Sequence, residues 1–401
     1  MDPAPNEARP AAALSARFAE AFRDWRRERL SKHAAAVALS VLVMALRWPS
    51  AVFSPVPVED ERVYFGAFHL AAQGESPYQL RYFYPPGFAV AGGWAVERWG
   101  EIPVLAGLRL ANLLGMALIA WCALAWLPWP WHRRCLTAAA LVALSPAVRS
   151  AVLWGNLSLA AVGTLLAALL TWRARPLVAG LLLGLSLAVK PIGPLAAVIL
   201  MTHRPAGGGR RHLVAATVGL ALAAGSLIPF PHLDDFLALR GGGPESGRNL
   251  ALHRVLDCFG VEIEALTLAA AVALTAVVFA RRRTLAPAHF VSFTATATLL
   301  ATPLVWDHTL LLALPVAVLA LAVAWDRWTS RTPPRRGGAR RAALRRYEPA
   351  LVVLLVLAMQ LSGGLGGVET WSRWSQGLFA ALPALAPAVL TLYLFRTTDP
   401  F

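Results

Sequence analysis

The fold is decided by residues 176–202, which read PLVAGLLLGLSLAVKPIGPLAAVILMT. The stretch is long enough to cross a bilayer, which takes about 20 apolar residues at a rise of about 1.5 Å each. Lys190-Pro191 and Pro194 interrupt it, and proline removes a backbone donor and clashes with the preceding helical turn. We therefore predict two half-helices that meet near Lys190, in place of a single kinked span.

The rest of the chain repeats this apolar pattern. Of the 401 residues, 57% are hydrophobic and 15% are charged, against about 25% charged in an average soluble domain. Disorder needs low hydrophobicity, and three scattered cysteines are too few for a disulfide scaffold. We predict an all-α polytopic membrane protein with about 10–12 transmembrane or half-spanning helices. The other predicted spans are roughly 34–54, 103–127, 136–154, 157–172, 213–231, 263–280, 289–305, 309–325, 349–363 and 377–395.

The excess of positive charge predicts the orientation. The two half-helices bring 26 of the 37 basic residues, but only 8 of the 22 acidic residues, to one side of the membrane. Basic residues in short loops remain in the cytoplasm, so we predict that both termini are cytoplasmic. This side includes a basic, amphipathic segment at 1–33, predicted to lie along the membrane, and a linker at 326–347. A soluble nucleic-acid binder would not carry its arginines between apolar runs of membrane length, so no nucleic acid is expected as a partner.

The loops on the opposite side collect polar and aromatic residues. The loop 55–101 is too long for a simple connection, and a second long loop covers 232–262. Ionisable residues at membrane depth are costly and usually functional, so their gathering on one face predicts a site there. The candidates are Asp60, Glu61, Tyr64, Tyr84, Asn156, Lys190, Arg248, Asn249, Arg254, Trp306, Asp307 and His308.

Lys190 is the most informative of these residues. It is one of only two lysines, Lys32 being the other, in a chain with 35 arginines. A lysine supplies a compact point charge of the kind that binds phosphate, although a lysine reaching from a broken helix to the interface would look the same. Glu59-Asp60-Glu61 also fits a solvated turn, Tyr84-Pro85-Pro86 an interfacial aromatic belt, and Asp307-His308 a polar helix cap.

Sequence signatures of soluble enzymes are missing. The sequence contains no phosphate-binding loop, no nucleophile elbow, and no HExxH or CxxC pattern. We therefore expect no nucleotide or other cofactor and no dedicated metal site.

Several elements together resemble glycosyltransferase family 87, the polyprenyl-phosphate-mannose-dependent mannosyltransferases of the GT-C superfamily. The similarity runs from about Pro57 to Pro315, and its order and spacing are more specific than any one piece. Two departures are Asn156 and Ser158, where the family usually has Gln and Asn, and a third is Asn249-Leu250-Ala251-Leu252, where Asn-Gln-Ser-Leu is common. The matching elements are Asp60 with Tyr64, Ala71-Ala72, Gly74, Pro77-Tyr78, Phe83-Tyr84-Pro85-Pro86, Gly155-Asn156, Ala179-Gly180-Leu181 with Gly184 and Lys190-Pro191, and Thr302-Pro303 with Trp306-Asp307-His308.

The resemblance implies a GT-C-like membrane domain over 34–401 in the cell membrane, with a catalytic first external loop. A sugar, mannose in the first place, would pass from a polyprenyl phosphate to a hydroxyl of a glycolipid or polysaccharide, with inversion. Asp60 is then the first candidate for the catalytic base and His308 the second. Lys190, helped by Arg248 or Arg254, would bind the donor phosphate. The predicted substrate contacts are Glu61, Tyr64, Tyr84, Asn156, Asn249, Trp306 and Asp307.

Three other interpretations stay open. The transferred sugar could be arabinose or another pentose. A secondary transporter or lipid flippase also has broken helices and charges within the membrane, although the polar groups here lie on one face and no repeated halves are visible. A non-catalytic scaffold for envelope assembly would tolerate substitution of Asp60 and Lys190.

Overall fold

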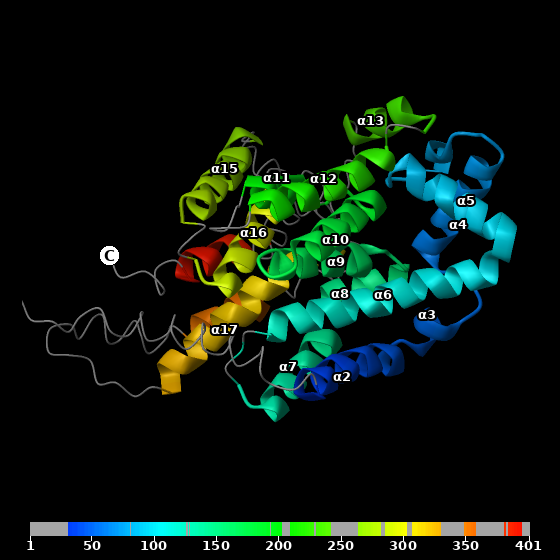
Figure 1. Cartoon of the computed structure of the whole chain (residues 1–401). Coiled ribbons are helices and arrows are strands. Elements are labelled where there is room, and N and C mark those ends of the chain that lie inside the picture. The colour runs from blue at the N-terminus through cyan, green and yellow to red at the C-terminus, as the bar shows by residue number, and fades with distance from the viewer. Residues whose placement is uncertain are drawn as a thin grey trace, which may run out of the picture.

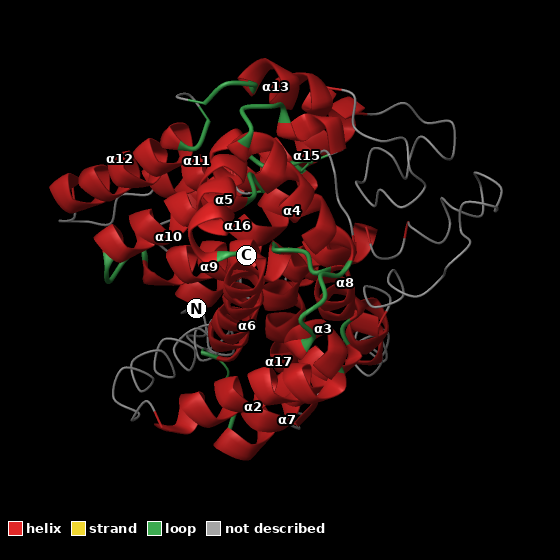
Figure 2. Cartoon of the chain, turned by 90° about the vertical axis from the view of Figure 1, so that its right-hand side faces the viewer, coloured by secondary structure: helices red, strands yellow, loops and turns green. Residues whose placement is uncertain are grey.

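The computed structural model describes residues 31–80, 82–125, 127, 129–192, 194–202, 209–227, 230–241, 264–281, 285–302, 307–329, 349–357, 381 and 384–394. Within these ranges the regular structure is helical throughout and no strand occurs (Figure 2). The prediction of an all-α fold is confirmed. Most of the predicted N-terminal segment, most of the linker 326–347, and the loop from 242 onwards lie outside these ranges.

From α2 to α11 the helices follow one another with short connections (Figure 1). Further helical residues lie at 349–357 and 384–394. The named elements are α2 (Ser31–Arg47), α3 (Pro49–Phe53), α4 (Glu59–Ala72), η1 (Pro77–Leu80), α5 (Pro86–Trp99), α6 (Glu101–Leu124), α7 (Trp131–Leu144), α8 (Pro146–Trp154), α9 (Ser158–Thr171), α10 (Pro176–Val189), α11 (Pro194–Thr202), α12 (Gly209–Gly225), α13 (Leu233–Gly241), α15 (Glu264–Arg281), α16 (Pro287–Leu300), η2 (Asp307–Ala313) and α17 (Leu314–Thr329).

The length and composition of the helices fit a membrane protein. Two described helical stretches, Glu101–Leu124 and Thr309–Asp326, are long and apolar enough to cross a bilayer by themselves. Shorter apolar helices accompany them, among them Ser158–Thr171 and Pro176–Val189. A polytopic architecture therefore follows from the described part of the chain.

The predicted span 136–154 is bent in two. Helices α7 and α8 meet at an angle of 57°, with the break at Ser145-Pro146. Pro146 has no backbone N–H to continue the first helix, and the Ser145 hydroxyl accepts a hydrogen bond from the backbone N–H of Val148, which starts the second. A serine directly before a proline is a helix-start signal, so this bend was readable from the sequence.

The break at Lys190 is present where the sequence predicts it. Helix α10 ends at Val189 and α11 begins at Pro194. A side chain at Gly180 would collide with the backbone of Ala215, and one at Gly184 would meet Leu222. From the first of these contacts to the second, the residue numbers rise in both helices, so α10 and α12 run parallel. The chain between them must therefore return to the end of the molecule where α10 began.

Other contacts show that the basic loops share that end. The imidazole of His212, in the first turn of α12, lies 3.1 Å from the carbonyl oxygen of Trp172, which directly follows α9 in the connection to α10. The guanidinium of Arg173 lies 5.7 Å from the ring centre of Phe290 at the start of α16. We call this the basic end. The described start of α12, residues 209–212, therefore lies on the side of Arg173, as expected if the basic loops share one side of the membrane.

The opposite end holds the polar and aromatic residues. Helices α4, α5 and α13 gather there, at the right and upper right of Figure 1. A second apolar cluster lies between them and includes Tyr64, Phe68, Tyr78, Tyr84 and Phe236. The Ser76 hydroxyl donates to Asp235 at 2.7 Å, so the described part of the loop 232–262 packs on the loop 55–101. We call this the Asp60 end.

Candidate functional site

Asp60 lies in the first turn of α4, where the sequence places three acids in a row. Glu59, Asp60 and Glu61 all fall in this turn, and carboxylates are stabilised there by the positive end of the helix dipole. Successive residues of a helix point about 100° apart, so the three carboxylates face different surroundings. Glu59 is exposed, Asp60 is half-buried and Glu61 is buried.

Asn156 holds the Asp60 carboxylate. Its Nδ2 atom donates to Oδ2 of Asp60 at 2.6 Å. Its Oδ1 atom accepts from the backbone N–H and the hydroxyl of Ser158, at 3.0 and 2.6 Å. Because the Oδ1 side already faces these donors, the amide can present only its NH₂ group to Asp60. The orientation of Asn156 therefore follows from its partners.

Lys190 completes the array. The residue is the first after α10, where the helix breaks, and its Nζ donates to Oδ1 of Asn156 at 3.0 Å and to Oγ of Ser158 at 2.8 Å. The ammonium also lies 5.5 Å from the ring centre of Tyr84. A carboxylate and an ammonium are thus joined through one amide, although Asp60, Asn156 and Lys190 come from three separate segments.

Two tyrosines line the same place. The hydroxyls of Tyr64 and Tyr84 share a hydrogen bond of 2.5 Å, and the rings meet edge to face with centres 4.9 Å apart. Tyr64 also accepts from the backbone N–H of Leu157 at 3.3 Å. Burial raises the pKa of both hydroxyls well above that of a free tyrosine, and the nearby Asp60 carboxylate raises it further. Both tyrosines therefore act as neutral hydrogen-bonding groups.

The surroundings of Asp60 adjust its proton affinity. Desolvation by burial raises the pKa of this carboxyl, while the hydrogen bond from Asn156 and the charge of Lys190 act in the opposite direction. Burial is the larger effect, so the pKa lies above its usual range. A carboxylate with raised pKa is a better proton acceptor than a solvated one.

A comparison with known families agrees with this arrangement. The sequence model of glycosyltransferase family 87 matches residues 82–305, which is more than half of the chain. The chain belongs to glycosyltransferase family 87. It is accordingly a membrane glycosyltransferase, and it acts on a sugar donor and an acceptor. No curated protein and no solved structure matches the chain.

The matched region covers only part of the candidate site of this glycosyltransferase. Tyr84, Asn156 and Lys190 lie within residues 82–305, whereas Asp60 precedes the matched region and His308 follows it. The structure connects Asp60 to the matched part directly, through its hydrogen bond with Asn156. The acidic turn of α4 and the family-matched segments therefore form one site.

Glu61 has partners of its own. Its Oε1 and Oε2 atoms accept from Nε and Nη2 of Arg109 at 2.9 and 2.8 Å, and Oε2 also accepts from the backbone N–H of Val58 at 2.8 Å. These bonds engage both carboxylate oxygens. The predicted role of Glu61 as a substrate contact stays a prediction.

The structure describes only some of the remaining predicted site residues. The backbones of Asp307 and His308 begin the short helix η2, and η2 lies against α8 and α9, the helices on either side of the turn that holds Asn156. Arg248, Asn249, Arg254 and Trp306 lie outside the described residues, and their roles stay predictions.

Two residues of the site were missed from the sequence. Arg109 is a single basic residue in the interior of an apolar helix of membrane length. Such a charge is costly unless it is paired, and this was the signal in the sequence that Arg109 has a buried partner. Ser158 was noted only as a departure from the family pattern, although its hydroxyl bonds both Asn156 and Lys190. Among the residues that the structure covers, His, Cys, Asp and Glu form no group of three that could hold a metal ion.

Proposed function

We propose that this glycosyltransferase moves mannose from a polyprenyl-phosphate donor to a hydroxyl of a glycolipid or polysaccharide acceptor, with inversion, on the external face of the cell membrane. The observation that carries the proposal is the joined array of Asp60, Asn156 and Lys190. It offers a proton acceptor and a cation within one small site, and transfer from a sugar phosphate to a hydroxyl needs both.

Asp60 serves as the base. A hydroxyl is a weak nucleophile, so its proton should be removed as it attacks. An Asp60 carboxylate oxygen takes the acceptor's proton, and the acceptor oxygen forms a new bond to C1 of the sugar. The bond between C1 and the phosphate oxygen breaks, and its electron pair leaves with the phosphate. One such displacement on a β-linked donor gives an α-glycoside.

Lys190 stabilises the leaving group. The lipid phosphate gains negative charge as the C1–O bond breaks, and a fixed cation at that point lowers the barrier. The Lys190 ammonium is held in place by Asn156, Ser158 and the Tyr84 ring. Because its site is already assembled, little reorganisation is needed when the donor arrives. Arg248 and Arg254 are proposed to assist from the loop 232–262, and His308 is proposed as a second contact to the donor or as the alternative base.

The donor class is tested with purified protein in lipid nanodiscs. Three donors are supplied with a glycolipid acceptor: polyprenyl-phosphate mannose, polyprenyl-phosphate arabinose and a nucleotide-linked mannose. The proposal expects transfer from the lipid-linked mannose only, and an α-linked product by NMR. Transfer from the nucleotide sugar, or a β-linked product, would contradict it, and transfer of arabinose alone would keep the mechanism but change the sugar.

The cation's role is tested by Lys190→Met. The donor KM should rise or kcat should fall on the order of 10²-fold, as when one stabilising donor is removed from an active site. Lys32→Met, at the chain's other lysine, is the matched control and should behave as wild type. Unchanged donor kinetics in Lys190→Met would show that this lysine is structural.

A further inference from the structure

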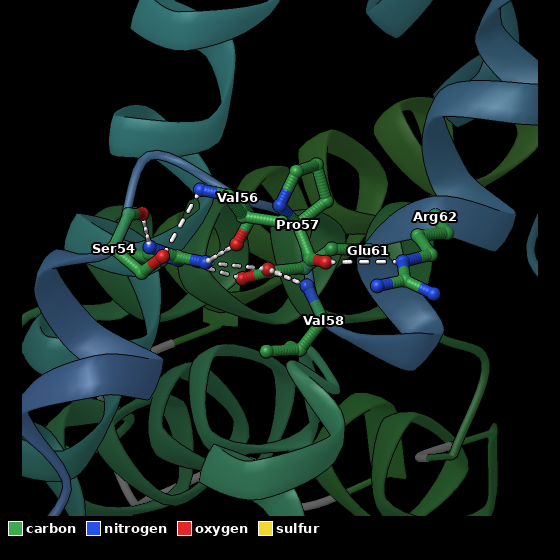
Figure 3. Close-up of polar contacts among 7 residues, drawn as sticks. Ser54, Val56, Pro57, Val58, Glu61 and Arg62 are labelled. Carbon is green, nitrogen blue, oxygen red and sulfur yellow. Dashed lines mark hydrogen bonds and ion pairs between the residues drawn. The ribbon is translucent and has the colours of Figure 1, made fainter.

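The segment that leads into α4 is held by one arginine from α6. Besides its two bonds to Glu61, the guanidinium of Arg109 donates to the carbonyl oxygen of Val56 at 2.9 Å and to that of Ser54. Figure 3 shows these contacts around Ser54, Val56, Val58 and Glu61. Arg109 therefore binds both the segment 54–58 and the first turn of α4, and it uses all of its nitrogens.

This pair lies away from solvent. Glu61 is 1% exposed and Arg109 is 6% exposed. Removing one partner of such a pair leaves a buried charge without compensation. Arg62 offers a contrast, because within the described part of the chain its guanidinium bonds the Pro57 carbonyl oxygen, at 3.2 Å, from an exposed position. The planar guanidinium of an arginine suits the buried position 109, because its several N–H groups can bond two carboxylate oxygens and two carbonyl oxygens at the same time.

The buried pair also touches the turn that carries Asn156. Gly155 has a φ of +69° and adopts the left-handed conformation. A Cβ at this position would lie 2.6 Å from Cγ of Glu61 and 2.6 Å from Cγ2 of Val58, so only glycine allows this approach. Two consecutive residues of α4 thus meet two consecutive residues of the turn, since Glu61 packs on Gly155 and Asp60 is bonded by Asn156.

We propose that Arg109 and Glu61 are positioning residues for the transfer reaction: they fix the first turn of α4 against the turn 155–156 and so set where the Asp60 carboxylate stands. The inference rests on the proposed function, because it gives Asp60 the part of the base. It assigns Glu61 to the support of that base. A displacement of about 1 Å at a reacting group costs on the order of 10²-fold in rate, so a support of this kind matters to the chemistry.

The test is Arg109→Lys, with Glu61→Gln as a second variant. Lysine keeps the charge but lacks the fork that reaches both Glu61 oxygens and the two carbonyls. Arg62→Lys is the matched control, since it alters an exposed arginine bonded to the same segment. Each protein is purified in nanodiscs, and rates are expressed per folded, monodisperse molecule.

Arg109→Lys and Glu61→Gln should lower kcat on the order of 10- to 100-fold while the donor KM changes less than about twofold. In Arg109→Lys, which keeps the positive charge, the low-pH limb of the rate profile should also move to higher pH, because an Asp60 displaced from Asn156 loses a hydrogen bond that stabilises its anion. Glu61→Gln is judged on kcat and KM alone, because the charge of Glu61 raises the pKa of Asp60 and its loss acts in the opposite direction. A purely structural pair would reduce the amount of folded protein and leave both quantities unchanged, which would overturn the proposal.

Gly155→Ala approaches the same contact from the other side. It leaves the Arg109–Glu61 pair chemically intact but puts a methyl group where Glu61 and Val58 lie. We expect the same loss in kcat and the same shift of the pH limb in the folded protein. Wild-type kinetics in Gly155→Ala would contradict the account even if neither pair variant folds.

Hydrogen exchange separates this inference from the proposed function. A wild-type protein that transfers no lipid-linked sugar would refute the proposed function alone. In that case the peptides covering 54–62 and 154–158 are followed in intact protein. Arg109→Lys should speed exchange in both segments if the pair holds them together. Faster exchange confined to 54–62, with 154–158 as in wild type, would refute the positioning role.

Discussion

The side-chain amide of Asn156 donates to the carboxylate of Asp60 at 2.6 Å, between residues 96 positions apart in the chain. The same amide accepts from Lys190 at 3.0 Å. Asn156 therefore stands between the one carboxylate and the one ammonium of the array. Because one end of the amide donates and the other accepts, Asn156 can bond both Asp60 and Lys190 in only one orientation. The carboxylate and the ammonium are therefore held on fixed sides of the amide.

Asn156→Asp should damage the reaction severely. The new carboxylate cannot donate to Asp60, repels it, and competes with it for Lys190. We expect kcat/KM to fall on the order of 10²-fold or more, in the range typical for loss of a positioned base. The control is Gln73→Glu, the same amide-to-acid change at the exposed end of α4. Near-normal kcat/KM in Asn156→Asp would show that the amide does not hold Asp60.

The pH profile should report Asp60 directly. The base must be ionised to work, so the rate is lost as the pH falls through its pKa, which burial raises. Lys190 lowers that pKa by its charge. In Lys190→Met the low-pH limb of kcat/KM should therefore move to higher pH. A low-pH limb that stays in place, or moves to lower pH, would show that the charge of Lys190 does not lower the pKa of the catalytic base.

The parallel packing of α10 and α12 depends on small residues. Gly180 faces the backbone of Ala215 without room for a side chain. Gly180→Leu should destabilise the protein by about 1–3 kcal/mol through overpacking, seen as a lower unfolding temperature in detergent. Gly107→Leu is the control, because a Cβ on Gly107 meets nothing within 4 Å. Equal stability of the two variants would contradict this helix contact.

Cysteine labelling tests the topology. In a background without native cysteines, Glu75→Cys reports the Asp60 end and Gly209→Cys the basic end, and both positions are exposed. An impermeant maleimide should label Glu75→Cys in intact cells, and Gly209→Cys only after permeabilisation. Labelling of Gly209→Cys in intact cells would overturn the orientation inferred from the basic loops.

Much of the helical framework could be predicted from the sequence. Apolar runs mark the helices, and the break at Lys190-Pro191 follows from proline chemistry. The rule that basic loops stay on one side is enough to place Asp60, Asn156 and Lys190 together at the opposite end. That rule assigns residues to a face and says nothing about which side chains touch.

The finer geometry depends on contacts that periodicity cannot supply. Arg109 and Glu61 are 48 positions apart, and neither residue reveals the other. The bend at Ser145-Pro146 is different, because the serine and proline signal it; it was missed because the apolar run on both sides is long enough to read as one span. The need for glycine at residue 155 appears only when Glu61 and Val58 are seen against it.

The most direct measurement of the central claim is the rate of sugar transfer by Asp60→Asn. The protein is purified in nanodiscs with polyprenyl-phosphate mannose, and donor binding is measured in the same samples. Asparagine keeps the size of the side chain and removes the proton acceptor. We predict that donor binding persists while kcat falls on the order of 10²- to 10⁴-fold. A kcat within a few-fold of wild type would contradict the account, because the transfer would then need another base.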